Sequence, residues 1–203
     1  IYNVTSVTSQ YGTAIRADTR EYQGPNTFSG GANIYIQNVG IPEFEDPDNL
    51  GNTIRSANGI VARSGTGQID IGAGDIYTTG TGIDAHSEGG FVKIRTNGVV
   101  AAGDTGIKID NDGTFDSYVY TEAAVTASTG AGISIDNTAG TRSTYVSANS
   151  DITGQTNGIE INEIGRSGGG GTAVYVNGTN SSVIGQTADG IKITSTASDA
   201  SVT

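Results

Sequence analysis

The stretch Gly132-Ile133-Ser134-Ile135 decides the fold, because close copies of it recur along the chain. The same pattern, with alanine or isoleucine at its fourth position, returns at 59–62, 82–85, 106–109, 158–161 and 190–193, and Ala14-Ile15-Arg16-Ala17 lacks only the glycine. The residue between the two apolar positions is polar in six of these seven copies. Such a period of two predicts a strand that buries one face.

Each copy belongs to a longer repeating unit. From Ile60 onward, successive repeat isoleucines are 23, 24, 26, 26 and 32 residues apart. Two further apolar clusters lie in each interval, and the cluster just before each repeat contains Ile54, Ile76, Val100, Val125, Ile152 or Ile184. Three short strands cannot bury a face alone, whereas stacked units can. The sequence therefore predicts an all-β fold, a right-handed parallel β-helix (a solenoid) with three short strands per coil and about seven coils.

Length and composition argue against several classes of partner and of metal site. We expect residues 1–203 to form a single β-helix domain that is a fragment of a longer protein. Acidic residues outnumber basic ones 21 to 10, and the net charge of −11 argues against nucleic acid or an anionic membrane surface as the main partner. The absence of cysteine and the presence of one histidine exclude disulfides, cysteine metal sites and sites with two or three histidines.

The first unit is longer, since Ile15 and Ile60 are 45 residues apart, and we interpret it as one coil with insertions. Loop insertions are expected at about 18–32 and 37–52, and a glycine-rich one at about 162–171. The second loop holds the candidate binding residues Glu43, Phe44, Glu45, Asp46 and Asp48. Long loops on a rigid scaffold often bind partners, and a tolerated surface insertion is the alternative.

Acidic residues at the corner after the repeat strand are the main candidates for chemistry. Asp110 and Asp136 should stack about 4.8 Å apart, close to the carboxylate separation of a retaining glycosidase. The simpler interpretation is that both aspartates cap turns, with Asn111 and Asn137 stacked beside them. Asp110, Asp112 and Asp116 partly match a calcium loop, but the closing bidentate glutamate is missing. We expect no dedicated metal site and no cofactor.

A second stretch, Asp84 to Glu88, contains residue types of a catalytic triad. On a strand, Asp84 and His86 share one face whereas Ser87 points to the other, so the three cannot converge. We therefore interpret His86 as an exposed corner residue and expect that the chain is not an enzyme.

In each unit the third short strand is followed by a glycine-containing turn and then by Gly-Ile-x-Ile or Gly-Ile-x-Ala. This order resembles the passenger repeat of bacterial autotransporters, the type V secretion systems. Residues 125–135 and 152–161 carry the resemblance best, and it extends from Val7 to Ile193. The resemblance implies a right-handed β-helix that is exported through an outer-membrane barrel, and the lack of cysteine agrees with passage through a narrow pore. Members of this family act as adhesins, self-association factors, toxins or protease stalks.

These observations lead to one functional expectation and two alternatives. We expect a surface-exposed or secreted passenger that acts as an adhesin or virulence factor and binds a host-cell receptor, a glycan, a matrix component or other cells. Contact with the membrane would come only through a C-terminal translocator barrel that this sequence does not contain. The first alternative is a β-helical polysaccharide lyase or hydrolase, which needs outward carboxylates clustered on adjacent coils. The second is a segment of a phage tailspike, which would be trimeric.

Overall fold

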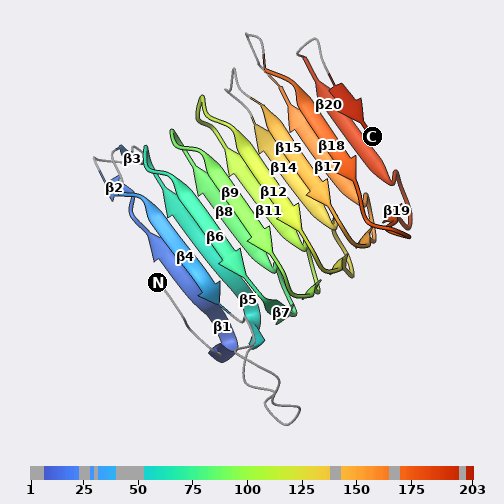
Figure 1. The fold of residues 1–203 in the computed structure, drawn as a ribbon. Helices are drawn as coiled ribbons and strands as arrows, with labels where there is room; N and C mark the ends of the chain where they lie inside the picture. Colours follow the sequence, from blue (N-terminus) through green and yellow to red (C-terminus); the bar gives the residue numbers. More distant parts are fainter. Residues whose placement is uncertain are drawn as a thin grey trace.

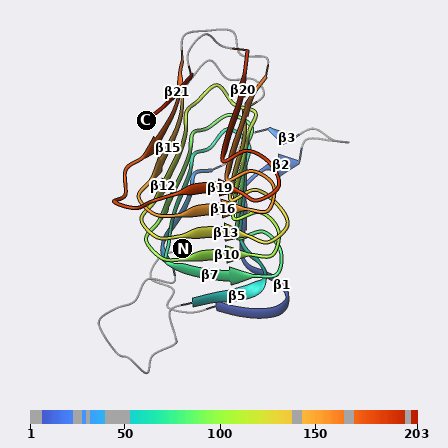
Figure 2. The ribbon, with the colours of Figure 1, turned by 90° about the vertical axis from the view of Figure 1, so that its right-hand side faces the viewer.

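A computed structural model describes residues 7–22, 28–29, 32–39, 53–137, 143–164, 170–196 and 200–203. Within these ranges the chain is an all-β parallel solenoid without helices, and its short strands stack side by side along one axis (Figure 1). Figure 2 shows short strands that cross between two walls of longer strands, so the section has three sides. The predicted fold class is confirmed, and its right-handed winding stays a prediction.

Three strand positions repeat from coil to coil. The first position holds the Gly-Ile repeats, in β1 (Val7–Asp18), β5 (Thr53–Ser64), β8 (Ile83–Ser87), β11 (Ile107–Asn111), β14 (Ile133–Asn137), β17 (Ile159–Glu163) and β20 (Ile191–Ser195). The second holds β4 (Ile34–Val39), β6 (Ile69–Ala73), β9 (Val92–Thr96), β12 (Ser117–Thr121), β15 (Thr144–Ala148), β18 (Thr172–Val176) and β21 (Ala200–Val202). The third holds β7 (Asp75–Thr78), β10 (Val100–Ala102), β13 (Val125–Ala127), β16 (Ile152–Gly154) and β19 (Val183–Gly185).

Hydrogen bonds join these strands into two parallel sheets. The second-position strands form a seven-stranded sheet, and the first and third positions form a twelve-stranded sheet, because β5 pairs with both β7 and β8. Five turns, from β7 to β21, have three separate strands. In the two N-terminal turns the third and first strands run on as one strand, β1 or β5, and β1 pairs with β5 in parallel.

The core is a set of aliphatic ladders that run along the axis. Equivalent repeat isoleucines are paired in register, for example Ile107 with Ile133 and Ile133 with Ile159, and all three are fully buried. Burial of each such side chain stabilises the fold by about 1.5–3 kcal/mol.

The expected inward position of Ile184, in the cluster before the last repeat, is wrong: its neighbour Val183 pairs with Ile152, and Ile184 is exposed. The two residues are adjacent, and alternation alone does not choose between them.

The long first unit is one coil, as predicted, because β4 pairs with β6 and β1 with β5. The insertions are shorter than expected at their edges. Residues 37–39 continue β4, residues 162–163 belong to β17, and β2 (Glu21–Tyr22) pairs with β3 (Phe28–Ser29) in an antiparallel hairpin within 18–32.

In the part of the chain that the structure describes, no helix is long and apolar enough to span a membrane.

Candidate functional site

The binding residues expected from the sequence, Glu43, Phe44, Glu45, Asp46 and Asp48, lie outside the described residues. The described surface carries two other concentrations of functional side chains. One is on the seven-stranded sheet and is aromatic, and the other is on the twelve-stranded sheet and contains the single histidine.

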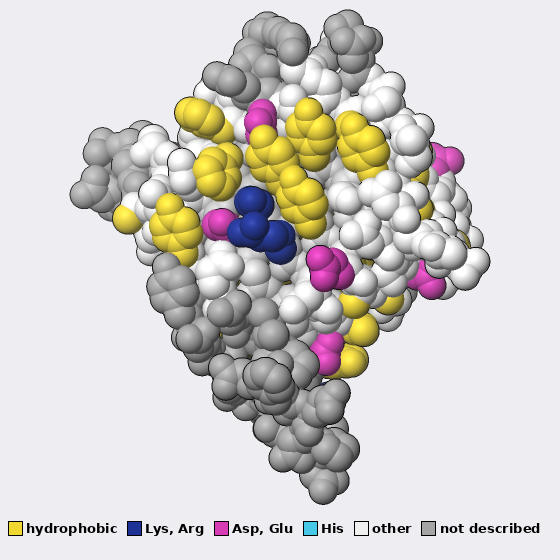
Figure 3. Space-filling model, viewed as in Figure 1, with side chains coloured by type: hydrophobic (Ala, Val, Ile, Leu, Met, Phe, Trp, Pro, Cys, Tyr) yellow, Lys and Arg dark blue, Asp and Glu magenta, His cyan; other side chains and the backbone are white. Residues whose placement is uncertain are grey.

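Strand alternation places a group of tyrosines on the outer face of the seven-stranded sheet. In β12, Val119 is fully buried, so Tyr118 and Tyr120 on either side of it point outward. The register then sets Tyr145 beside Tyr118, and Arg95 beside Tyr120. We name the outward side chains Tyr118, Tyr120, Tyr145, Tyr175, Lys93 and Arg95 the tyrosine face. Figure 3 shows hydrophobic side chains gathered around Lys and Arg on this side of the molecule.

The rings of the tyrosine face contact one another and remain open to solvent. The Tyr118 ring is nearly parallel to those of Tyr145 and Tyr120, with centroids 5.5 Å and 6.4 Å apart. Tyr120 and Tyr175 are each 38% exposed. Each such contact between aromatic rings contributes about 0.5–1.5 kcal/mol of stabilisation. The rings are therefore held in place on the sheet in the unbound protein.

Two cations lie on β9, at one edge of the tyrosine face. Arg95 donates from Nη2 to both carboxylate oxygens of Asp70, at 3.1 Å each, and the Lys93 ammonium lies 5.9 Å from the centroid of the Tyr120 ring. One recess of about 370 Å³ opens beside Arg95 and Tyr120, and another of about 480 Å³ opens beside Tyr145 and Tyr175. Both volumes fall in the range of sites that hold small groups.

Tyr118 is expected to stay protonated well above the pH at which a tyrosine ordinarily ionises. Its hydroxyl donates to the Asp116 carboxylate, and this bond raises the pKa of Tyr118 to about 12. The raised pKa stabilises the folded chain fully below pH 10, the ordinary tyrosine value, and the contribution is lost as the pH rises through about 12. NMR of ring-labelled tyrosine measures this, and Asp116→Asn should return Tyr118 to the ordinary range. Titration of Tyr118 near pH 10, the ordinary tyrosine value, in the unmodified protein would contradict it.

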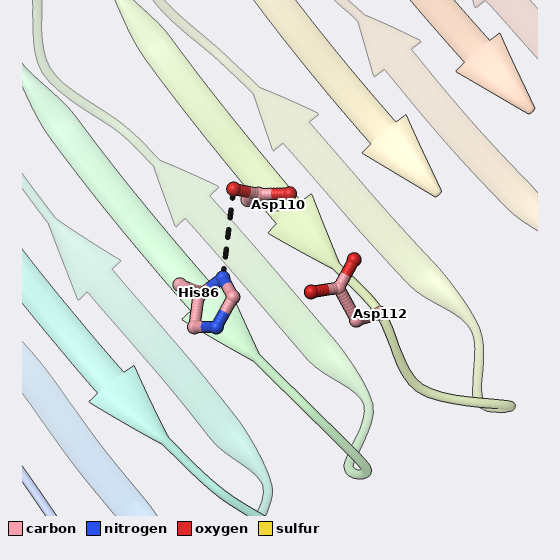
Figure 4. Close-up of side chains that lie close together, drawn as sticks. All are labelled: His86, Asp110 and Asp112. Atoms are coloured by element: carbon pink, nitrogen blue, oxygen red, sulfur yellow. Dashed lines mark ion pairs between the residues drawn. The ribbon is translucent and has the colours of Figure 1, made fainter. Parts of the chain in front are cut away.

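The second concentration is centred on His86, in β8. The imidazole Nδ1 lies 3.5 Å from Asp110 Oδ2, and Nε2 lies 3.9 Å from Glu88 Oε1. Asp110 comes from the paired position on β11, and Asp112 follows two residues later on the same outward side. Figure 4 shows His86, Asp110 and Asp112 close together. The Asp110 carboxylate raises the pKa of His86, and His86 in turn lowers the pKa of Asp110.

The expectation of an exposed corner histidine is wrong, because the His86 side chain is only 17% exposed and packs between carboxylates. As predicted, Ser87 points inward, where its hydroxyl bonds to Gly90. Asp84 pairs with both terminal nitrogens of Arg63 and is not directed at His86. The stretch therefore does not assemble a triad.

Asp110 and Asp136 are register neighbours, as the sequence predicts. Each carboxylate is engaged on a different side, Asp110 with His86 and Asp136 with the side-chain amide of Asn162 at 2.9 Å. A general acid needs a raised pKa, whereas that of Asp110 is lowered. The expectation that the chain is no enzyme stays a prediction.

The partial calcium loop does not come together as one group. Asp116 bonds to Tyr118 and to the backbone N–H of Ser143, on the side of the seven-stranded sheet, and Asp110 and Asp112 meet His86 instead. The predicted amide stack is also replaced, because Ser117 Oγ links Asn111 and Asn137.

Comparison with known proteins identifies no relative. No family model, no curated protein and no solved structure matches the chain. The fold and the two surface features therefore carry the functional argument.

Sequence reasoning missed the tyrosine face, although its signal is present. Tyr118-Val119-Tyr120, Tyr145-Val146 and Val174-Tyr175 each place an aromatic residue next to a valine of the second strand. These valines form one of the two further apolar clusters of each unit, so they should point inward and the tyrosines beside them outward.

Proposed function

We propose that the chain is a surface-displayed or secreted binding protein, an autotransporter-type passenger that acts as an adhesin, and that the tyrosine face contacts its partner. The partner is a protein or glycan on a cell surface. The observation that carries the proposal is the pair of 38%-exposed rings, Tyr120 and Tyr175, on a rigid sheet that also presents Arg95. Tyrosine and arginine are enriched at the centres of protein interfaces and among the residues that dominate binding energy.

Rigidity supports the same proposal. The strands under the tyrosine face are held by parallel ladders on both sides, and the rings are packed against one another. A surface that is ordered before binding loses less conformational entropy when it meets a partner. Export to the cell surface is supported by the resemblance of the repeat to autotransporter passengers, and the absence of cysteine agrees with it.

Two variants test where binding occurs. In the face variant, Tyr120→Ser and Tyr175→Ser remove the two most exposed rings of the tyrosine face without touching the core. In the loop variant, Glu43→Gln, Glu45→Gln, Asp46→Asn and Asp48→Asn neutralise the candidate loop. Binding of the labelled protein to cultured host cells is measured for each, with circular dichroism as the control for folding.

We expect saturable binding by the unmodified protein and by the loop variant, and an affinity at least about tenfold lower for the face variant. Loss of binding in the loop variant alone would move the site to residues 43–48 and contradict the assignment to the tyrosine face. Absence of saturable binding by the unmodified protein to cells, and to arrayed glycans and matrix proteins, would contradict the binding function itself.

A further inference from the structure

The His86 cluster offers ligand atoms of a definite chemistry. One imidazole nitrogen and one oxygen from each of Asp110 and Asp112 all lie within 4.8 Å of one another. We infer that these three side chains form a binding site for a zinc-class divalent cation. The site lies on the twelve-stranded sheet, so it is independent of the tyrosine face and of the function proposed for it.

The backbone explains why the three groups meet. His86 and Asp110 occupy paired positions on adjacent parallel strands, so their side chains leave the sheet next to each other. The Asp112 N–H still donates to the Ser87 carbonyl at 2.9 Å, and this bond holds the chain beside β8 for one residue beyond β11. Figure 4 shows the Asp112 side chain on the same side of the sheet, next to the imidazole and the Asp110 carboxylate.

The separation of the first two ligand atoms suits a metal better than a direct hydrogen bond. His86 Nδ1 and Asp110 Oδ2 are 3.5 Å apart, whereas charge-assisted N–H···O bonds are about 2.7–2.9 Å long. Ligand atoms about 2.0–2.1 Å from a tetrahedral zinc ion are about 3.3–3.4 Å from each other. The observed distance is thus close to one edge of such a site, and an oxygen of exposed Asp112 lies within 4.8 Å of ligand atoms of the other two residues.

The far side of the imidazole supplies a second, independent indication. A histidine that binds a metal usually directs its other ring nitrogen at a carboxylate, which fixes the tautomer. Here Nε2 lies 3.9 Å from Glu88 Oε1, while Nδ1 lies 3.5 Å from Asp110 Oδ2. Nε2 thus has a carboxylate on its side of the ring, at a distance longer than a hydrogen bond, and a small shift of Glu88 would bring the two into contact.

The ligand set selects the class of metal. Calcium and magnesium are bound by oxygen atoms, calcium by six to eight of them, whereas an imidazole nitrogen with carboxylates suits zinc and its first-row neighbours. Three protein ligands leave a fourth position of a tetrahedral ion open, and water fills it. A bound ion would also join β8 and β11 and neutralise part of the local negative charge.

Because His86 is the single histidine of the chain, zinc binding can be followed at one imidazole. Untagged full-length chain is titrated with Zn²⁺ by calorimetry, and the ring nitrogens are observed by NMR. We expect one ion per chain, a shift of Nδ1 and not Nε2 on binding, and no displacement by a tenfold excess of Ca²⁺. Saturable binding should be lost in His86→Gln and fall by about tenfold or more in Asp112→Asn.

Asp136→Asn is the matched control, because Asp136 is the outward aspartate one coil further along the same face and lies outside the cluster. It should bind zinc as the unmodified protein does, and thermal unfolding checks that all variants are folded. Equal zinc binding by His86→Gln, or full displacement by calcium, would overturn the inference. So would the absence of saturable binding by the folded, unmodified chain.

Discussion

Replacing Ile133 with aspartate is expected to destabilise the solenoid by about 4 kcal/mol or more. Ile133 is fully buried and lies in register between Ile107 and Ile159, so the new carboxylate would enter an apolar ladder. A domain of ordinary stability has about 5–15 kcal/mol in total, so this one change removes a large part of it. Urea unfolding followed by circular dichroism measures the loss.

The same substitution one residue later is the matched control. Ser134 points outward, and its register neighbours are Lys108 and Glu160, one of each charge. Attraction to the lysine and repulsion from the glutamate largely offset each other, and Ser134→Asp should change the stability by less than about 1 kcal/mol. Equal destabilisation by the two variants would show that the inward and outward positions have been assigned incorrectly.

The strands and their order were accessible from the sequence because each depends on local information. A period of two marks a strand with one buried face, and the near-constant spacing of the repeat isoleucines sets which strands become neighbours. The exposed position of Ile184 shows the limit of predicting burial from such local information. Val183 and Ile184 are both apolar, and only pairing of Val183 with Ile152 across the coils decides which of them points inward.

The surface features were less accessible, because they depend on contacts between coils and on side-chain rotation. Alternation predicts that Tyr118 and Tyr145 point outward. To predict that the two rings are in contact, one must also know how many residues each turn contains. Likewise, the sequence places Asp110 next to both His86 and Asp136. Asp110 contacts His86 because of opposite charge and of the orientation of the two side chains. Neither can be deduced from the spacing of the repeats.

The glycine that opens the repeat has a packing role in the structure. A Cβ added to Gly106 would lie 2.4 Å from the Gly132 carbonyl oxygen and 2.5 Å from Val125 Cγ1, and the backbone at Gly106 is not in the left-handed region. The contact at Gly132 is similar, with the Gly158 carbonyl oxygen 2.7 Å from the added atom. The repeat glycines from Gly59 to Gly158 thus let one coil approach the next.

Gly106→Ala is therefore expected to destabilise the fold by about 1–3 kcal/mol, since the atoms that the new methyl group meets belong to a backbone carbonyl and a buried valine. Gly72→Ala is the matched control, because the close contacts of its new Cβ are with the end of the Gln37 side chain, which can shift if its hydrogen bonds to Asp70 weaken. Alanine there also restricts the unfolded chain, which offsets that loss, so the variant should change the stability by less than about 1 kcal/mol. Thermal and urea unfolding of the two variants compare them directly. If Gly106→Ala were as stable as Gly72→Ala, adjacent coils could separate to admit a methyl group, and the recurrence of glycine before the isoleucine would need a cause other than close packing.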